Sequence, residues 1–575
     1  MRPSRSFVLL FVILLALKTL LVLTVFADSA FSDNYTFVKM ARSVYHDGTF
    51  TVHGLPTHYY SFLYPIILSW TYVFGDMTLV YLFMKLTNVF VSTLAIVPVW
   101  LLARDFLKPR TALLLAALVG VLPSTFAFAG YLMAENLFYP LFLFTIYFYY
   151  KAYTTPKRTW AVLGGLFAGL AILTKALGLT LLILPFLMLL RQRTLISLRS
   201  TLLIALFALP APLFILLRNL TLFGATSQGI LGGYAKSFIA PSWPSLFFPF
   251  LYWIAVYLLY FLLSGYPFTG LTFHSLSLTG KKFRTLLFLS LFAILAVIFV
   301  SANHNIVHSA PWFLDGRPIG RHVDTVLPLL FLLSTIAFTR GARLRHLWSL
   351  HLSLSLLSSG LLIYQFFPVN NLSLSWIGTL KTGIHFLLTR TVLFAAPLYL
   401  LTFLLFGLIL FALCLFLLRL RKINHILLFL ICLSFSVSIL GYAINASNAY
   451  TYWYMGDQAQ LGLWLNQHLP PHQTLLIDAR DEAKITKARQ DGLYEQYTTC
   501  LRQPEPGEPV YTVCNSATIL GLWLNHDIRI GDASQSGGYD YLITRHSLNL
   551  PLLTRSPGGI NVYQPLKIEE GSRNP

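Results

Sequence analysis

Charged side chains are scarce in this sequence. Asp, Glu, Lys and Arg make up 11% of its 575 residues, whereas hydrophobic residues make up 56% and the mean hydropathy is +0.68. A soluble domain carries about a quarter charged residues, so the composition excludes an ordinary soluble protein. Apolar runs near the length that spans a bilayer recur through the first 445 residues. The sequence therefore predicts a polytopic α-helical membrane protein.

Cysteine is also rare, with four residues in the whole chain. Cys414 and Cys432 lie inside apolar runs, whereas Cys500 and Cys514 bracket the polar stretch "CLRQPEPGEPVYTVC". If this stretch is extracytoplasmic, Cys500 and Cys514 could close a disulfide over a hairpin-like loop. Two free thiols are the alternative, and the sequence leaves both open.

No G-x-x-x-x-G-K-[ST] phosphate loop is present, so we do not expect nucleotide hydrolysis to supply the energy. The formal charge of +20 does not indicate a nucleic-acid partner, because the bases are clustered in short turns between apolar runs. Asp105 is the only acid in these turns, which read "ARDFLKPR", "KAYTTPKR", "RQRTLISLR", "KKFR", "RGARLR" and "RLRK". This bias predicts that the turns are cytoplasmic.

The apolar runs predict about thirteen transmembrane helices, with the N-terminus in the cytoplasm and the C-terminus outside. The first run is too long for a signal peptide, so we expect it to remain as an uncleaved helix. The stretch 160–190 reads as two short spans, although a single re-entrant element is the alternative. The expected spans are 7–26, 78–101, 111–128, 134–151, 160–174, 177–190, 201–217, 246–263, 285–301, 323–338, 347–366, 392–418 and 425–443.

The chain divides by composition near residue 445. We expect a transmembrane catalytic domain over 1–444 and a small extracytoplasmic α/β domain over 445–575, because short alternating strands bounded by Gly, Asn, Asp and Pro appear there. Long loops commonly carry binding and catalytic residues. The long outer loops of the first domain are 27–77, 218–245, 302–322 and 367–391.

Isolated charged and aromatic residues in and beside these outer loops are the candidate site residues. Charged groups at a membrane edge are costly to keep dry and tend to face cavities or partners. A carboxylate could accept a proton from an acceptor hydroxyl, and Lys or Arg could hold a leaving phosphate. The alternatives are helix caps or solvated acids for Asp33 and Glu135, and a snorkelling side chain for Lys175. The candidates are Asp33, Tyr35, Arg42, His58, Tyr59, Glu135, Lys175, Arg218, Arg317 and Arg321.

The order of these motifs resembles the GT-C membrane glycosyltransferases, in particular the protein O-mannosyltransferases, aminoarabinose transferases and related enzymes. Asp33 and "MAR" follow the first span, "FLYPIIL" precedes the second, and Glu135, "LTKALGL" and "RNLTLFG" come in turn. The resemblance covers most of residues 1–225, together with "GRPIGRHVDTVLPLL" at 316–330. It implies transfer of a sugar from a polyprenyl phosphate to an extracytoplasmic acceptor, with inversion at the anomeric carbon.

The resemblance also implies residue roles. Asp33 matches the first-loop acid, the general base or acceptor-orienting residue, but Asn34 stands where many members have a second acid. Glu135 matches the second-loop acid, which in some relatives contributes to metal or acceptor binding, and it is the second candidate catalytic residue. The basic residues that could contact the donor phosphate are Lys175, Arg218, Arg317 and Arg321, and residues of a donor or acceptor pocket are Tyr35, Arg42, His58 and Tyr59.

The expected partners are a polyprenyl-phosphate-linked sugar, membrane lipid and an acceptor that is a protein, lipid or glycan hydroxyl. The sequence shows no required cofactor and leaves a divalent metal open. His304, His308 and His322 have no regular ligand spacing, which favours interfacial or hydrogen-bonding roles over a metal site. A transporter or flippase of lipid-linked saccharides is the alternative function, but it would place its charges near the bilayer midplane.

Overall fold

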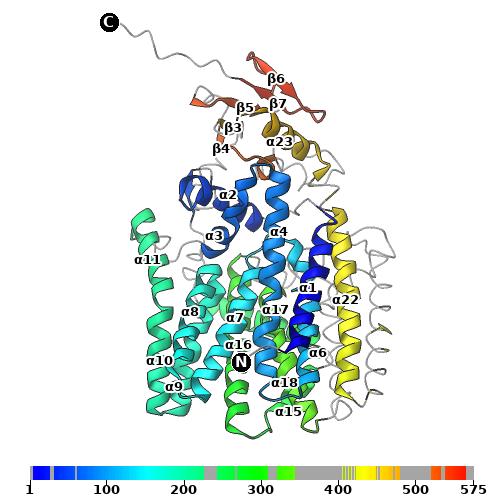
Figure 1. Cartoon of the computed structure of the whole chain (residues 1–575). Coiled ribbons are helices and arrows are strands. Elements are labelled where there is room, and N and C mark those ends of the chain that lie inside the picture. The colour runs from blue at the N-terminus through cyan, green and yellow to red at the C-terminus, as the bar shows by residue number, and fades with distance from the viewer. Residues whose placement is uncertain are drawn as a thin grey trace. The chain divides into compact units, whose positions relative to one another are not determined.

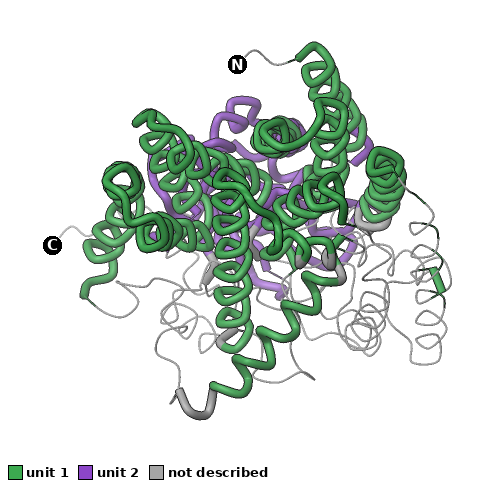
Figure 2. The backbone as a smooth tube through the Cα atoms, turned by 90° about the horizontal axis from the view of Figure 1, so that it is seen from below, with its two compact units in different colours: residues 1–21, 88–130, 134–445 green, residues 22–87, 131–133, 446–575 purple. Residues whose placement is uncertain are grey.

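The computed structural model divides the chain into two compact units. Unit 1 comprises residues 1–21, 88–130 and 134–445, and unit 2 comprises residues 22–87, 131–133 and 446–575 (Figure 2). The residues that the structure describes are 4–25, 32–52, 54–57, 61–225, 243–265, 268–308, 320–342, 422–448, 454–470, 473–478, 520–531, 538–544 and 546–564, with isolated positions between 405 and 450.

Unit 1 is built of helices that stand side by side (Figure 1). Among the residues that the structure describes, five stretches, the second of which begins in unit 2, are long and apolar enough to cross a membrane: Arg5–Val22, Met77–Ala103, Leu195–Phe223, Lys281–Ile306 and Ile423–Ala443. Its helices are α1 (Arg5–Val22), the end of α4 (Met77–Thr93), α5 (Ile96–Ala103), α6 (Pro109–Val121), η2 (Ala127–Gly130), α7 (Glu135–Thr154), α8 (Arg158–Thr174), η3 (Ala176–Leu182), α9 (Ile183–Gln192), α10 (Leu195–Ala208), α11 (Pro210–Phe223), α14 (Trp243–Ser264), α15 (Thr269–Ser275), α16 (Lys281–His308), α17 (Gly320–Asp324), α18 (Leu327–Thr339) and most of α22 (Ile423–Asn448).

The helices overlap the spans that hydropathy predicts, apart from 347–366 and 392–418, which lie almost wholly outside the described residues. The stretch 160–190 is helical on both sides of Lys175, whose backbone is extended, and its division into two separate spans remains a prediction. A multi-pass helical membrane architecture is therefore confirmed. The total of thirteen spans remains a prediction.

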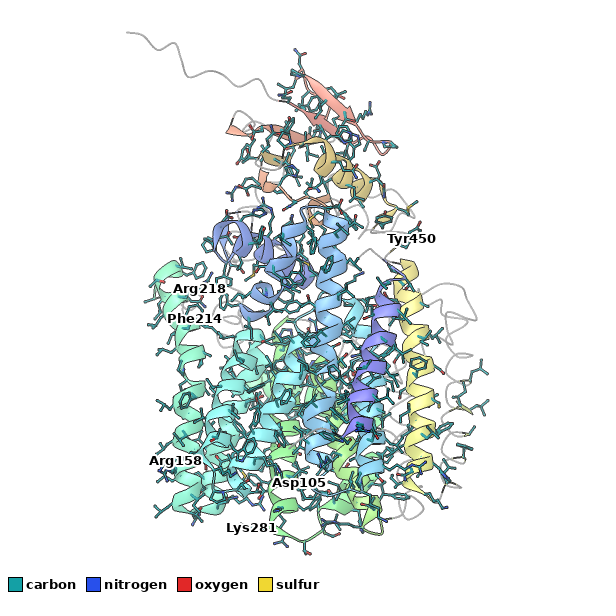
Figure 3. All side chains as sticks on the ribbon, in the orientation of Figure 1. Asp105, Arg158, Phe214, Arg218, Lys281 and Tyr450 are labelled. Atoms are coloured by element: carbon teal, nitrogen blue, oxygen red, sulfur yellow. The ribbon has the colours of Figure 1, made fainter. Side chains whose placement is uncertain are left out.

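Three of the base-rich turns have labelled residues at one end of unit 1 (Figure 3). Figure 3 shows Asp105, Arg158 and Lys281 at this end and Arg218 at the opposite end. Asp105 is neutralised there by Lys151, whose Nζ lies 2.6 Å from Asp105 Oδ2, and by the Tyr150 hydroxyl, which donates to the same oxygen at 2.9 Å. The segregation of bases agrees with a single membrane side for these turns.

Helix α8 packs closely against α10 at a glycine. A Cβ added to Gly165 would lie 2.6 Å from the carbonyl oxygen of Ile204 and 2.8 Å from Phe207 Cβ. Contacts this short are not tolerated by a side chain, so the two backbones approach only because position 165 is glycine. Small residues that let helices approach are a general feature of membrane helix packing.

Gly165→Ala is therefore expected to destabilise the protein by about 1–3 kcal/mol, the usual effect of overpacking. Gly169→Ala is the matched control, because Gly169 lies one turn further along α8 and its nearest neighbours would be 3.5 Å from an added Cβ. Thermal unfolding in detergent measures both variants. Equal unfolding temperatures for the two variants would contradict the proposed close contact.

Unit 2 joins the segment 22–87, which contains the predicted first outer loop, to a C-terminal sheet. The loop provides α2 (Ser32–Asp47), the antiparallel pair β1 (Thr51–Val52) and β2 (Leu55–Pro56), α3 (Leu63–Ser69), η1 (Trp70–Phe74) and the start of α4. The C-terminal part provides α23 (Asp457–His468) and the strands β3 (Thr474–Asp478), β4 (Asp527–Gly531), β5 (Tyr541–Thr544), β6 (Leu552–Arg555) and β7 (Asn561–Tyr563).

The five strands form one mixed sheet in the order β4-β3-β5-β7-β6. β3 pairs in parallel with β4 and β5, whereas β7 pairs antiparallel with β5 and β6. Leu475 and Ile477 lie on the face whose core includes residues of α23, and Leu476 faces the other side, as strand alternation requires. The expected small C-terminal sheet is present.

Candidate functional site

A buried carboxylate begins helix α7. Glu135 is its first residue and is 1% exposed. Lys151, 16 residues later on the same helix, pairs with Asp105 at the base-rich end of unit 1. At 1.5 Å per residue, Glu135 lies about 24 Å along α7 from that pair. Glu135 is therefore displaced towards the end of unit 1 at which Arg218 lies.

Two cations from distant segments converge on this carboxylate. The Lys175 ammonium, at the break between α8 and η3, donates to Glu135 Oε1. The Arg321 guanidinium, on the short helix α17, brings its Nε within 3.1 Å of the same oxygen. Both cationic side chains are 14% exposed, and the Glu135 side chain is 2% exposed. The cluster therefore retains slight access from outside only through its cations.

Further polar groups surround the cluster. The Tyr139 hydroxyl, one turn after Glu135 on α7, donates to the Arg321 carbonyl at 2.6 Å and so supports α17. His322 is 7% exposed, and its Nδ1 lies 3.3 Å from Ser301 Oγ. Asp324 is 2% exposed, with the Tyr260 hydroxyl beside its carboxyl group. We did not single out Tyr139 or Asp324 from the sequence. The signal for Asp324 was an acid at the start of an apolar run.

The charge balance of the cluster suits an anionic ligand. Glu135 offers one negative charge to two cations, both of which approach the same carboxylate oxygen. Ammonium and guanidinium groups form strong charge-assisted hydrogen bonds to phosphate oxygens. Glu135 holds the two cationic side chains in fixed orientations before an anion binds. This lowers the conformational entropy that they lose on binding.

Arg218 occupies a different position from this cluster. It lies on α11, at the end of unit 1 opposite the base-rich turns (Figure 3). Its guanidinium donates to the Asn219 side-chain oxygen at 3.1 Å. We therefore base the expected donor-phosphate role of Arg218 on its position at this end of unit 1.

The first-loop candidates belong to unit 2. Asp33 is the second residue of α2, and Tyr35 and Arg42 follow on the same helix. Tyr35 is 2% exposed, and its ring centre is 5.9 Å from Lys39 Nζ. Its hydroxyl would lie 2.6 Å from a Cβ added to Gly521. The ring is therefore packed against the C-terminal segment.

Several predictions concern residues outside the described part of the chain. They are the site roles of His58, Tyr59 and Arg317 and the pairing of Cys500 with Cys514. The other two cysteines are Cys414, which also lies outside, and Cys432, which is a free exposed thiol. Within the described residues, no group of three or more His, Cys, Asp and Glu side chains is arranged to hold a metal ion.

Comparisons with known proteins bear on the fold of the chain. Residues 63–216 match the family model described as dolichyl-phosphate-mannose-protein mannosyltransferase. The crystal structure of ArnT from Cupriavidus metallidurans bound to undecaprenyl phosphate is 14% identical, covers 98% of each chain and gives a TM-score of 0.53. The crystal structure of apo ArnT from the same organism is 14% identical and gives a TM-score of 0.50. The alignment covers 97% of this chain and 98% of the ArnT chain.

The arabinosyltransferase EmbB from Mycobacterium smegmatis aligns more loosely. It is 13% identical, covers 81% of this chain and 42% of its own, and gives a TM-score of 0.45. The sequence has no significant match among curated proteins. The ArnT structures show that the chain shares the ArnT fold, and this fold and the family-model match agree with the resemblance found in the motifs.

Proposed function

We propose that this membrane protein of GT-C fold is a glycosyltransferase that moves a sugar from a polyprenyl-phosphate donor to an extracytoplasmic hydroxyl. The observation that carries the proposal is the buried Glu135–Lys175–Arg321 cluster, which presents two positioned cations beside one carboxylate. A ligand with this chemistry is bound by the structural neighbour ArnT, whose crystal form contains undecaprenyl phosphate. The comparisons give no support to the transporter alternative.

The reaction is an inverting displacement at the anomeric carbon. The acceptor oxygen attacks that carbon while the bond from the carbon to the phosphate oxygen breaks, and the lipid leaves as polyprenyl phosphate. Asp33 accepts the proton of the acceptor hydroxyl as general base. Its assignment comes from its position in the first outer loop, at the second residue of α2, and from the resemblance in motif order.

The cations stabilise the departing phosphate. Negative charge grows on the phosphate oxygens as the glycosidic bond breaks, so positioned donors stabilise the transition state more than the ground state. Lys175 and Arg321 fill this role in the cluster, and Arg218 and Arg317 are assigned to the same phosphate. Because two cations engage Glu135, we assign it a positioning role rather than direct contact with the reacting atoms.

The remaining first-loop residues complete the proposal. Tyr35, Arg42, His58 and Tyr59 form part of the donor or acceptor pocket. The base-rich turns face the cytoplasm together with the N-terminus, and the transfer site and the C-terminal domain face the opposite side. The segregation of Asp105, Arg158 and Lys281 from Arg218 in unit 1 supports this orientation (Figure 3).

Arg218→Gln is expected to raise the KM for the donor by about tenfold, because one charge-assisted hydrogen bond to phosphate is lost. The assay uses the purified full-length protein, a radiolabelled polyprenyl-phosphate sugar and membrane-extract acceptors, and follows both labelled product and released polyprenyl phosphate. Arg158→Gln, at the opposite end of unit 1, is the control and should leave the KM unchanged.

Two results would count against the proposal. If the donor KM of Arg218→Gln equals that of the wild type, Arg218 is not part of the phosphate site. The second result is that labelled lipid-linked sugar crosses the membrane of reconstituted vesicles intact, with no release of polyprenyl phosphate for any donor sugar. The protein is then a transporter, and the proposal of a glycosyltransferase is wrong.

A further inference from the structure

A small polar pocket lies inside unit 2, where α2 meets the segment that ends in β4. Its volume is about 70 Å³. A single water needs roughly 10–15 Å³ of such space, so the pocket has room for several waters or one small polyatomic ion. The residues around it are Lys39, Arg42, Ser43, Asp47, Thr51, Gly54, His526, Asp527, Ile528 and Arg529.

Basic side chains from both segments line this pocket. Lys39 is 5% exposed and donates to the Leu524 carbonyl at 2.8 Å. Arg42 follows one turn later on α2, and Arg529 projects from β4. Of the acids, Asp527 pairs with Arg529 at 3.3 Å and is 37% exposed, while Asp47 is exposed at the end of α2. The two cations of α2 therefore have no close buried carboxylate within the described residues.

The electrostatics show that this positive charge is poorly compensated. Burial lowers the pKa of Lys39 well below its usual range, and the neighbouring Arg42 lowers it further, while Asp527 raises it. Burial also lowers the pKa of Arg42, against the effects of Tyr72, Asp527 and Asp47. Buried cations are stabilised by a nearby negative charge. An anion in the pocket would supply that charge.

Two residues that line the pocket each carry a buried polar atom that lacks a hydrogen-bond partner within the described residues. These atoms are Arg42 Nε and His526 Nδ1. Burial lowers the pKa of His526 to about 4, so its ring is neutral near pH 7. Because His526 Nε2 donates to the Pro470 carbonyl at 3.1 Å, Nδ1 of the neutral ring is an acceptor. Two lining residues of the pocket thus carry an unmatched donor and an unmatched acceptor.

We propose that this pocket binds a small oxyanion, a phosphate or carboxylate group. An oxyanion accepts hydrogen bonds from Arg42 Nε and the other cations, and a hydroxyl on the ion, as in hydrogen phosphate, donates to His526 Nδ1. The inference shares Arg42 with the donor or acceptor pocket of the proposed function, whereas the other residues of this pocket, on α2, at 51–54 and at 526–529, have no role in the proposed sugar transfer. A bound ion would join α2, which carries Asp33, to the C-terminal segment.

The experiment measures binding of inorganic phosphate to the purified full-length protein. Equilibrium dialysis with radiolabelled phosphate is expected to show one saturable site in the millimolar range or tighter. Arg42→Gln and Arg529→Gln should each weaken binding by about tenfold or more, because each removes a charge-assisted contact. Arg555→Gln, an exposed arginine of β6 in the same unit, is the matched control and should bind as the wild type does.

Competition identifies the chemistry of the ligand. Displacement of phosphate by acetate at similar concentrations indicates a carboxylate group, whereas displacement by methyl phosphate alone indicates a phosphoryl group. The proposal is wrong if neither ion binds saturably, or if folded Arg42→Gln and Arg529→Gln bind as well as Arg555→Gln. It is also wrong if a saturating polyprenyl phosphate removes all the binding, because the ion then occupies the donor site.

Discussion

Asp33→Asn is expected to reduce sugar transfer by about 10²–10⁴-fold, the contribution of a positioned general base. The amide of asparagine has nearly the shape of the carboxyl group but cannot take the proton of the acceptor hydroxyl. Asp33 is the second residue of α2, so a substitution of equal size there should leave the helix intact. The measurement is kcat with labelled donor at saturating acceptor, alongside the thermal unfolding temperature.

Asp76→Asn is the matched control for this substitution. Asp76 also lies in unit 2, where its Oδ1 accepts hydrogen bonds from the backbone N–H groups of Thr78 and Leu79 at 2.8 and 3.1 Å. Asparagine caps helices as well as aspartate does, so this variant should retain both stability and activity. If Asp33→Asn retains wild-type turnover, the base is another residue. Because Asn34 stands beside Asp33, no second acid is adjacent to take over its role.

Hydropathy predicted the helices of unit 1 because a membrane-spanning helix satisfies its backbone hydrogen bonds within itself. Each helix can therefore be identified from its own run of apolar residues. The candidate cations of the site were also visible, since charges at a membrane edge stand out in an apolar sequence. Their pairing was not. Glu135 and Lys175 are 40 positions apart in the chain, and Arg321 comes from a third segment. No local sequence pattern indicates that Lys175 and Arg321 both approach the same carboxylate oxygen of Glu135.

The composition of unit 2 was harder to predict. The change in composition near residue 445 predicts a membrane domain followed by a C-terminal domain, and this division remains a prediction. By contacts, however, residues 22–87 group with 446–575. The contacts that join them use backbone carbonyls as acceptors, as where Lys39 reaches Leu524 O at 2.8 Å and the Tyr81 hydroxyl reaches Leu522 O at 2.5 Å. A carbonyl belongs to every residue, so such contacts leave no sequence signal. β6 leaves little signal in the sequence, because most of its residues are exposed, and buried and exposed positions do not alternate along it.

The Glu135 cluster makes a second strong prediction, on stability. Glu135→Gln is expected to destabilise the protein by about 3–5 kcal/mol, because Lys175 and Arg321 then remain buried without their carboxylate. Lys175→Met should cost less, because Arg321 still pairs with Glu135 at 3.1 Å. Both variants should lose sugar transfer, since each disturbs the cations that we assign to the donor phosphate. Unfolding temperatures and donor KM values, measured on the same samples, test these effects.

The double variant Glu135→Gln/Lys175→Met separates folding from catalysis. Removing Lys175 from the Glu135→Gln protein takes away a buried cation that has lost its partner, so stability should recover, with a coupling energy of about 0.5–3 kcal/mol. Sugar transfer should not recover, because the donor phosphate still lacks Lys175. If the two stability changes simply add, the side chains do not interact. If transfer returns together with stability, the cluster serves folding alone, and its cations have no part in binding the donor.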